Sequence, residues 1–172
     1  LNLNKPIGWT SFDVCKKIRI ITGEKRVGHG GTLDPFASGV LVVGTGVDTK
    51  ALHEISNTKK SYSASISLGL STDTHDLEGK TLLTKKVPRL SERRIRQVLN
   101  TFVGDYSQTP PMFSAKKVKG RKLYEYARKN LYIKRKPVLV KIYSISLDSY
   151  SYKNISFQVT CSKGTYVRVL GK

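Results

Sequence analysis

The chain has 172 residues, of which 38% are hydrophobic and 25% charged, enough for a globular domain with a hydrophobic core. Its 31 Lys and Arg against 12 Asp and Glu give a net charge of +19, which predicts a polyanionic partner. No apolar run approaches the roughly 20 residues of a membrane span and no basic helix has a broad apolar face, so nucleic acid is favoured over a membrane.

The first elements predicted along the chain are a short strand, a turn and a helix. Leu1 and Leu3 alternate with polar residues and lead into the turn-forming sequence KPIGWTS. Either Thr10 or Ser11 can cap the helix that follows, and Gly23 ends it. The predicted buried face of this helix has residues spaced by three and four positions, namely Val14, Cys15, Ile18 and Ile21.

Residues 28–41, GHGGTLDPFASGVL, hold the densest set of conformationally restricted positions in the chain. Two adjacent glycines allow close approach of another backbone, and Pro35 disfavours a helical conformation for Asp34. The apolar run over residues 39–44 then predicts a short buried strand. A carboxylate on a rigid loop beside a buried strand suits catalysis, whereas the structural alternative is that Asp34 only caps a turn.

Three further elements are predicted between residues 48 and 104. Residues 48–56 have helical spacing, and residues 61–70 alternate serine or glycine with apolar side chains, which predicts a strand with one apolar face. A polar loop, STDTHDLEG, follows. The next helix is predicted to begin at Ser91 and to end at Gly104. Its apolar face would consist of Ile95, Val98, Leu99 and Phe102.

The last third of the chain predicts a short helix after Gly120 and two strands, over residues 137–147 and 155–161, joined by a turn over residues 148–154. Cys15 and Cys161 lack the spacing of a zinc site or a disulfide framework, so both are expected to be reduced, buried thiols. Strands interspersed with separate helices indicate the α+β class, with a mixed, mainly antiparallel sheet and flanking helices.

Several segments of the chain resemble the TruB-type pseudouridine synthases, which isomerise a T-loop uridine of tRNA. GHGGTLDPFASGVL is similar to the catalytic motif of that family, and KPIGWTS to its first motif. Residues 108–128, QTPPMFSAKKVKGRKLYEYAR, resemble the block PPxxSAxKxxGxxLYExAR, and the loop STDTHDLEG resembles the segment TDTxDxxG. Residues 161–168, CSKGTYVR, resemble the third motif, CSKGTYxR.

The resemblance implies an active site in a cleft across the sheet. Asp34 corresponds to the essential catalytic aspartate, and Arg168 to the arginine that pairs with it. Tyr62 corresponds to a tyrosine that stacks on the flipped target base, in keeping with aromatic stacking on extruded RNA bases. Tyr166 corresponds to a tyrosine beside the target nucleotide. An isolated salt bridge is the structural alternative for the pair of Asp34 and Arg168.

Three further residues have both a functional and a structural interpretation. The resemblance implies that His29 occupies the space vacated by the flipped nucleotide, and that Lys5 and Pro6 help to build the floor of the active site. The residue types alone fit Lys5 equally well as a surface cation, and they favour His29 as a structural turn residue. They favour Tyr62 as a core aromatic, and only the resemblance reverses that interpretation.

The densest basic stretch supplies the RNA-contacting candidates Lys116, Lys117, Lys119 and Arg121. Their interleaving with Phe113, Tyr124 and Tyr126 favours an RNA-contacting surface over a solvated charge run. The aspartates and histidine of the 71–79 loop suggest a metal site, but a hard cation needs more oxygen ligands than this loop supplies. Because the family also uses no metal, neither a metal nor a cofactor is expected.

The resemblance predicts one pseudouridine synthase catalytic domain over residues 1–172, incomplete at its C-terminus and without the family's C-terminal RNA-binding domain. The expected activity is conversion of the T-loop uridine at position 55 of tRNA to pseudouridine. The expected partner is the T arm of tRNA, with no membrane partner, and the protein is expected to be a cytoplasmic monomer.

Three other functions are weighed against this one. A non-catalytic RNA-binding or tRNA-folding module would not need Asp34, Tyr62 and Arg168 together. An RNA-guided synthase of the dyskerin type shares GxLDP and GTYxR, but the TDTHDLEG loop and the PPMFSAKK block favour the stand-alone bacterial type. A carboxylate nuclease is disfavoured because no two-metal cluster is evident.

Overall fold

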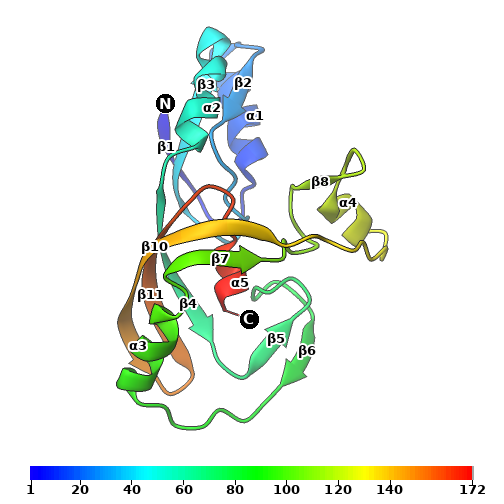
Figure 1. Ribbon diagram of the computed structural model, residues 1–172. Coiled ribbons are helices and arrows are strands. Elements are labelled where there is room, and N and C mark those ends of the chain that lie inside the picture. The colour runs from blue at the N-terminus through cyan, green and yellow to red at the C-terminus, as the bar shows by residue number, and fades with distance from the viewer. Residues whose placement is uncertain (172) are drawn as a thin grey trace. The chain divides into compact units, whose positions relative to one another are not determined.

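The computed structural model describes residues 1–171, whose contacts group into two compact units, Leu1–Thr58 and Lys59–Lys172. Every strand pair found in the described residues is antiparallel, and helices accompany the sheets in both units (Figure 1). The predicted α+β class with mainly antiparallel pairing is therefore confirmed.

The first unit is built on a three-stranded sheet in the order β1-β3-β2. Its strands are β1 (Asn2–Lys5), β2 (Val27–His29) and β3 (Gly39–Thr45), and its helices are α1 (Ser11–Thr22), the 3-10 helix η1 (Gly46–Lys50) and α2 (Leu52–Ser56). The core joins Val14 and Cys15 of α1 to Val27, Leu41 and Val43 of the sheet. Instead of the single helix predicted over residues 48–56, the structure has the two short helices η1 and α2.

Helix α1 has the predicted ends. Thr10 is its cap, since the Thr10 side chain accepts a hydrogen bond from Asp13 N and the Asp13 carboxylate accepts one from Thr10 N. Gly23 ends the helix in the left-handed conformation, at φ 69°. The predicted buried face is wrong at its far end, because Ile21 is 66% exposed. All buried residues of α1 lie in its first half, where the helix contacts the short sheet.

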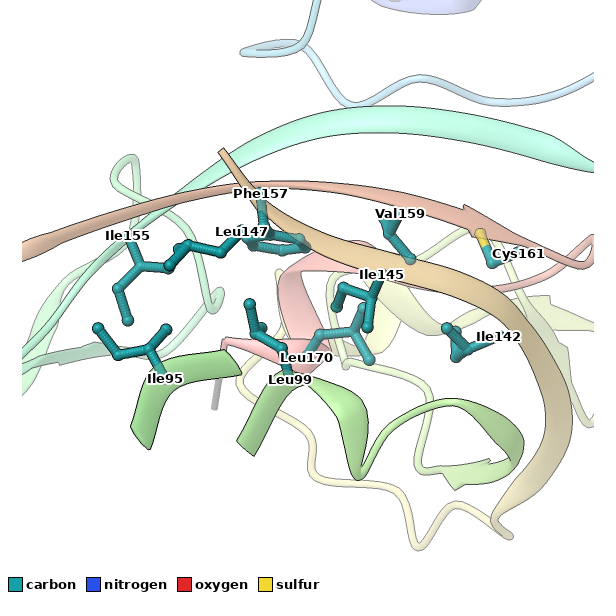
Figure 2. Packing of buried hydrophobic residues seen from close by; sticks show 10 residues of the cluster. All are labelled: Ile95, Leu99, Ile142, Ile145, Leu147, Ile155, Phe157, Val159, Cys161 and Leu170. Atoms are coloured by element: carbon teal, nitrogen blue, oxygen red, sulfur yellow. The ribbon is translucent and has the colours of Figure 1, made fainter. Parts of the chain in front are cut away.

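The second unit is built on a four-stranded sheet in the order β4-β11-β10-β7. These strands are β4 (Lys60–Ser67), β7 (Gly104–Gln108), β10 (Val138–Ser151) and β11 (Asn154–Cys161). Helices α3 (Glu92–Asn100) and α5 (Val167–Leu170) pack on one face of the sheet. Figure 2 shows Ile95, Leu99 and Leu170 of these helices directed at the apolar side chains of β10 and β11. The opposite face carries the serines of β4, three of which hydrogen-bond across to β11.

Two small hairpins complete the second unit. Strands β5 (Leu70–Thr72) and β6 (Thr81–Thr84) form one, and β8 (Lys117–Val118) and β9 (Arg121–Lys122) form the other, which leads into helix α4 (Leu123–Ala127). Lys119 and Gly120, at φ 50° and 81°, make the two-residue turn of the second hairpin. Positive φ at both positions is the hallmark of a type I′ turn, which matches the twist of the strands it joins.

Two predicted boundaries and one predicted buried residue in this unit are wrong. The strand predicted over residues 61–70 ends at Ser67, because the chain turns at Gly69 (φ 79°) into the β5–β6 hairpin. The turn predicted over residues 148–154 is only two residues long, since Ser151 still pairs with Asn154. In α3, Ile95 and Leu99 are buried as predicted, but Val98 is 43% exposed because it lies at the edge of the packed stripe.

Candidate active site

Asp34 lies in a turn between β2 and β3, in the first unit. The Asp34 carbonyl accepts a hydrogen bond from Ala37 N at 3.0 Å, which closes a four-residue turn with Pro35 in its second position. Proline is favoured there because its ring fixes φ at the value the turn requires. The side chain of Asp34 is half-buried. The turn predicted at Asp34 is therefore present, and residues 33–37 are called the Asp34 turn below.

The segment over residues 5–11 is hydrogen-bonded to the Asp34 turn. Ser11 is buried, and its Oγ accepts a hydrogen bond from Leu33 N at 3.0 Å and donates one to Leu33 O at 3.3 Å. The Pro35 carbonyl accepts hydrogen bonds from Gly8 N at 2.8 Å and Lys5 Nζ at 3.3 Å. The residues on both sides of Asp34 are thus fixed by partners far away in the sequence.

Lys5 is a buried structural cation, so its interpretation as a surface cation is wrong. Its side chain is fully buried, and Nζ also donates to the carbonyl oxygens of Pro6 at 2.9 Å and Trp9 at 2.6 Å. A buried ammonium is tolerated only where hydrogen-bond acceptors replace its water, and these backbone carbonyls do so. Pro6 is exposed, and its contribution to this arrangement is its carbonyl oxygen.

His29 is the last residue of β2 and is half-buried. Its Nδ1 lies within hydrogen-bond distance of the Gly31 carbonyl. Because a carbonyl oxygen can only accept, Nδ1 carries a proton in this arrangement. The contact fixes the orientation of the ring on the loop that leads to the Asp34 turn.

Tyr62 and Arg168 belong to the second unit. Tyr62 is half-buried on β4, opposite Val159 of β11, and packs against the main core. Arg168, on α5, donates from Nη2 to the Phe113 carbonyl at 2.6 Å and from Nη1 to the Thr74 carbonyl at 3.1 Å. Its Nη1 also forms an ion pair with Asp76 Oδ2 at 3.3 Å. Arg168 therefore joins α5 to two separate loops.

Asp76 organises the loop that connects β5 to β6. Its Oδ1 accepts hydrogen bonds from Thr74 Oγ1 at 2.6 Å and Glu78 N at 3.0 Å, while Oδ2 faces Arg168. Both side chains of the Asp76–Arg168 ion pair are less than a tenth exposed. Within residues 1–171, His, Cys, Asp and Glu side chains nowhere gather in groups of three or more that could hold a metal ion.

Gln108 is a site residue that the sequence did not reveal. It is 1% exposed, and its Nε2 donates to the Gly164 carbonyl at 2.6 Å while its Oε1 accepts from Tyr166 N at 3.0 Å. Both partners lie in the CSKGTYVR segment, and Tyr166 is half-buried directly before α5. The one sequence signal that could have identified Gln108 is its position just before the PPxxSA block.

The four basic candidates of the 108–128 segment lie on the β8–β9 hairpin. All are exposed, namely Lys116, Lys117, Lys119 and Arg121. Leu123, which is fully buried, and Tyr126, whose hydroxyl donates to Val118 O at 3.3 Å, support the hairpin from α4. This basic stretch therefore lies at the surface, and its contact with RNA stays a prediction.

The predicted site residues thus fall into two groups. Lys5, Pro6, His29 and Asp34 lie in the first unit, where the segment over residues 5–11 and the Asp34 turn are in direct contact. Tyr62, Tyr166 and Arg168 lie in the second unit with the basic hairpin. The predicted pair of Asp34 and Arg168 joins residues of different units and stays a prediction.

These motifs and this fold define a class of RNA-modifying proteins. Residues 19–167 match the family model described as the N-terminal domain of the TruB family pseudouridylate synthases, and the chain belongs to this family. Over 170 residues it is 48% identical to the tRNA pseudouridine synthase B of Clostridium kluyveri and 43% identical to that of Dehalococcoides mccartyi. Each alignment covers 99% of this chain, and the chain spans only 58% and 57% of those relatives.

Solved structures confirm the fold. A crystal structure of a Cbf5–Nop10–Gar1 complex is similar over 99% of this chain and 43% of the matched chain, with a TM-score of 0.72 and 29% identity. An H/ACA RNP bound to a substrate RNA containing 2'-deoxyuridine matches with a TM-score of 0.68 and 26% identity, over 99% of this chain and 41% of the other. Across residues 1–171, every helix is too short or too polar to cross a bilayer.

Proposed function

We propose that this chain is the catalytic part of a tRNA pseudouridine synthase that converts the T-loop uridine at position 55 to pseudouridine, with Asp34 as its nucleophile. The observation that carries the proposal is the fixed turn that presents Asp34. Ser11 holds the residue before Asp34, while Gly8 and Lys5 hold the Pro35 carbonyl after it. A nucleophile held this way loses little freedom on reaching the transition state.

The reaction needs no cofactor. The bond between C1′ of the ribose and N1 of uracil breaks, the base turns, and a new bond forms between C1′ and C5. C5 loses a proton and N1 gains one, so that atoms and electrons balance within the nucleotide. The Asp34 carboxylate attacks the base or the ribose, or assists elimination at the sugar.

Other residues of the motifs prepare the nucleotide and the carboxylate. The target uridine is stacked in the folded T loop, and flipping it out costs a few kcal/mol. Tyr62 stacks on the flipped base, Tyr166 lies beside it, and His29 fills the space it leaves. Arg168 favours the ionised form of Asp34 by Coulomb attraction. Its bonds to Phe113 and Thr74 support this role, because they hold the guanidinium in one orientation.

The charge distribution supports an RNA substrate. The segment from residue 59 to residue 172 carries 24 of the 31 basic residues but only 7 of the 12 acidic ones. Phosphate contacts made by such a surface release counterions, so we expect tRNA binding to weaken steeply as salt increases. The exposed lysines and arginine of the β8–β9 hairpin are the proposed contacts nearest to the PPxxSA block.

A stand-alone enzyme is favoured over an RNA-guided one. The identity to relatives named tRNA pseudouridine synthase B is 43–48%, against 25–29% for the Cbf5-type structures. The chain also carries the TDTHDLEG loop, in which Asp76 pairs with Arg168, so that the segment specific to the stand-alone type supports the proposed site directly.

The test is nucleoside analysis of unmodified tRNA incubated with the parent chain, with Asp34→Asn and with Asp48→Asn. Asp48 is an exposed aspartate of the same unit, which makes it a matched control. We expect pseudouridine at position 55 with the parent and with Asp48→Asn, and none with Asp34→Asn. Product from Asp34→Asn would overturn the assignment of the nucleophile. Binding without product from the parent would instead support a non-catalytic tRNA-binding module.

A further inference from the structure

A second group of cations lies in the second unit, between the β5–β6 hairpin and the first turn of α3. Its members are Lys85, Lys86, Arg89, Arg93 and Arg94, called the cationic strip below. All five are exposed. Residues 85–91 run without regular secondary structure, and a segment of this length can reach up to roughly 20 Å. The strip is therefore long enough to follow several successive phosphates of one nucleic-acid strand.

The charges of the cationic strip are not compensated within the protein. In the part of the chain that the structure describes, none of its five side chains forms an ion pair or a hydrogen bond with another side chain or a carbonyl. The one acidic residue in this segment, Glu92, is paired with Arg96 at 3.3 Å. Like charges that are near one another in sequence repel, and the segment stays in place because other parts of the unit hold its backbone.

Two tyrosines of the long β10–β11 hairpin fix that backbone. Tyr152 donates its hydroxyl hydrogen to the Val87 carbonyl at 2.9 Å, and the Tyr150 hydroxyl accepts from Leu90 N at 3.2 Å. Lys85 N donates to the Gly69 carbonyl at 2.8 Å. A Cβ at residue 69 would lie 2.5 Å from the Lys85 carbonyl oxygen, so a glycine at this turn leaves the space that the start of the strip occupies. The backbone that carries the strip is thus held in place by hydrogen bonds within the protein.

We propose that the cationic strip is a second phosphate-binding surface, which contacts the backbone of an RNA stem outside the T arm. The inference rests on the proposed function only in taking tRNA as the RNA. Figure 1 shows α3 and α4 well apart within the second unit, so the strip and the β8–β9 hairpin contact different parts of a bound RNA. Because the backbone of the strip is already held, only its side chains lose conformational freedom when they bind phosphate.

An anionic membrane is the competing partner. Cationic segments that bind membranes place apolar side chains beside the charges. Two apolar residues next to the cations of the strip, Val87 and Ile95, are buried instead, at 6% and 4% exposed. The adjacent β6 strand does expose Leu82 and Leu83, at 67% and 49%, so vesicle binding is measured in the same experiment.

The experiment compares two variants with equal loss of charge. The strip variant carries Lys85→Gln, Lys86→Gln, Arg89→Gln, Arg93→Gln and Arg94→Gln. The control variant carries five glutamines at exposed cations of the first unit, Lys16, Lys17, Lys25, Arg26 and Lys50. Binding is measured by fluorescence anisotropy between 50 and 200 mM salt, with unmodified tRNA, with an isolated T-arm hairpin and with phosphatidylserine vesicles. Circular dichroism checks that each variant is folded.

The strip variant is expected to bind tRNA about tenfold or more weakly than the parent at 100 mM salt. Its slope of log K against log salt should be smaller by about two to four, one unit for each lost phosphate contact. Binding to the T-arm hairpin should change less than about threefold. Equal losses in the two variants, or an unchanged salt slope, would overturn the proposal, as would a loss confined to vesicle binding.

Failure of this inference is distinguishable from failure of the proposed function. If the strip variant binds tRNA as the parent does and the parent forms pseudouridine, only the strip proposal fails. If the parent forms no pseudouridine but the strip variant still loses tRNA affinity and salt slope, the strip proposal holds and the enzymatic one fails. Substituting Tyr152→Phe, which keeps every charge, should weaken tRNA binding with an unchanged salt slope.

Discussion

Replacing Ser11 with alanine should loosen the turn that presents Asp34 without disturbing helix α1. The cap of α1 is Thr10, and Ser11 is the first helical residue, where alanine is a better helix former by up to about 0.5 kcal/mol. The substitution removes the hydrogen bonds between Ser11 Oγ and Leu33, at 3.0 and 3.3 Å. Each contributes about 0.5–1.5 kcal/mol, and Leu33 N loses its partner, so the net loss of stability is about 1–2 kcal/mol.

In the Ser11→Ala variant, the rate of catalysis should fall by more than the loss of folding stability alone would explain. A displacement of the reacting group by about 1 Å costs up to about a hundredfold in rate, so we expect kcat to fall about 10- to 100-fold with KM nearly unchanged. Urea unfolding measures the free energy of unfolding, and steady-state assays on unmodified tRNA measure kcat and KM. Thr10→Ala is the control, because it removes the helix cap for about 1 kcal/mol while the hydrogen bonds of the Thr10 side chain go to Asp13 and not to the Asp34 turn. Equal loss of kcat in both variants would refute the reasoning.

Four other outcomes follow from packing and burial. Phe157→Ala, at a site 1% exposed, should lower the free energy of unfolding by about 3–5 kcal/mol in urea titrations. Gly69→Ala should cost more than about 2 kcal/mol in the same assay, since φ is 79° and the new methyl group meets the Lys85 carbonyl. Burial raises the pKa of the Cys15 and Cys161 thiols, so mass spectrometry should find both unalkylated by iodoacetamide at pH 8 until urea unfolds the chain. Unfolded thiols ionise first as pH rises, so stability should decline above about pH 9.

Local signals made helix α1 and the Asp34 turn predictable. The cap and the left-handed glycine of α1 act within a few residues, and the Asp-Pro pair restricts its own backbone. Strand ends depend instead on partners distant in sequence. Tyr150 stays in β10 because it pairs with Ile155, and β4 stops at Ser67 where its partner β11 begins. Periodicity in one segment carries no information about the length of its partner.

The supporting residues of the candidate site show the same limit. Gln108 and Ser11 act through buried hydrogen bonds to loops more than 20 residues away, and neither stands out by type or spacing. Asp76 belongs to a recognised segment, but its pairing with Arg168 follows only from the folded loop. Motifs therefore identify the residues proposed to touch the substrate, whereas the groups that position them require the structure.

Composition also overstates how much charge is available to a partner. Lys5 is buried among backbone carbonyls, Arg168 is held by an ion pair and two carbonyls, and Arg135 donates to the Pro110 carbonyl. Such cations are part of the fold, and their counterions are already replaced by protein groups. Salt dependence of binding reflects only the cations that meet phosphate, each contributing about one unit of slope. The measured slope should therefore follow the exposed, uncompensated residues of the β8–β9 hairpin and the cationic strip rather than the net charge of the chain.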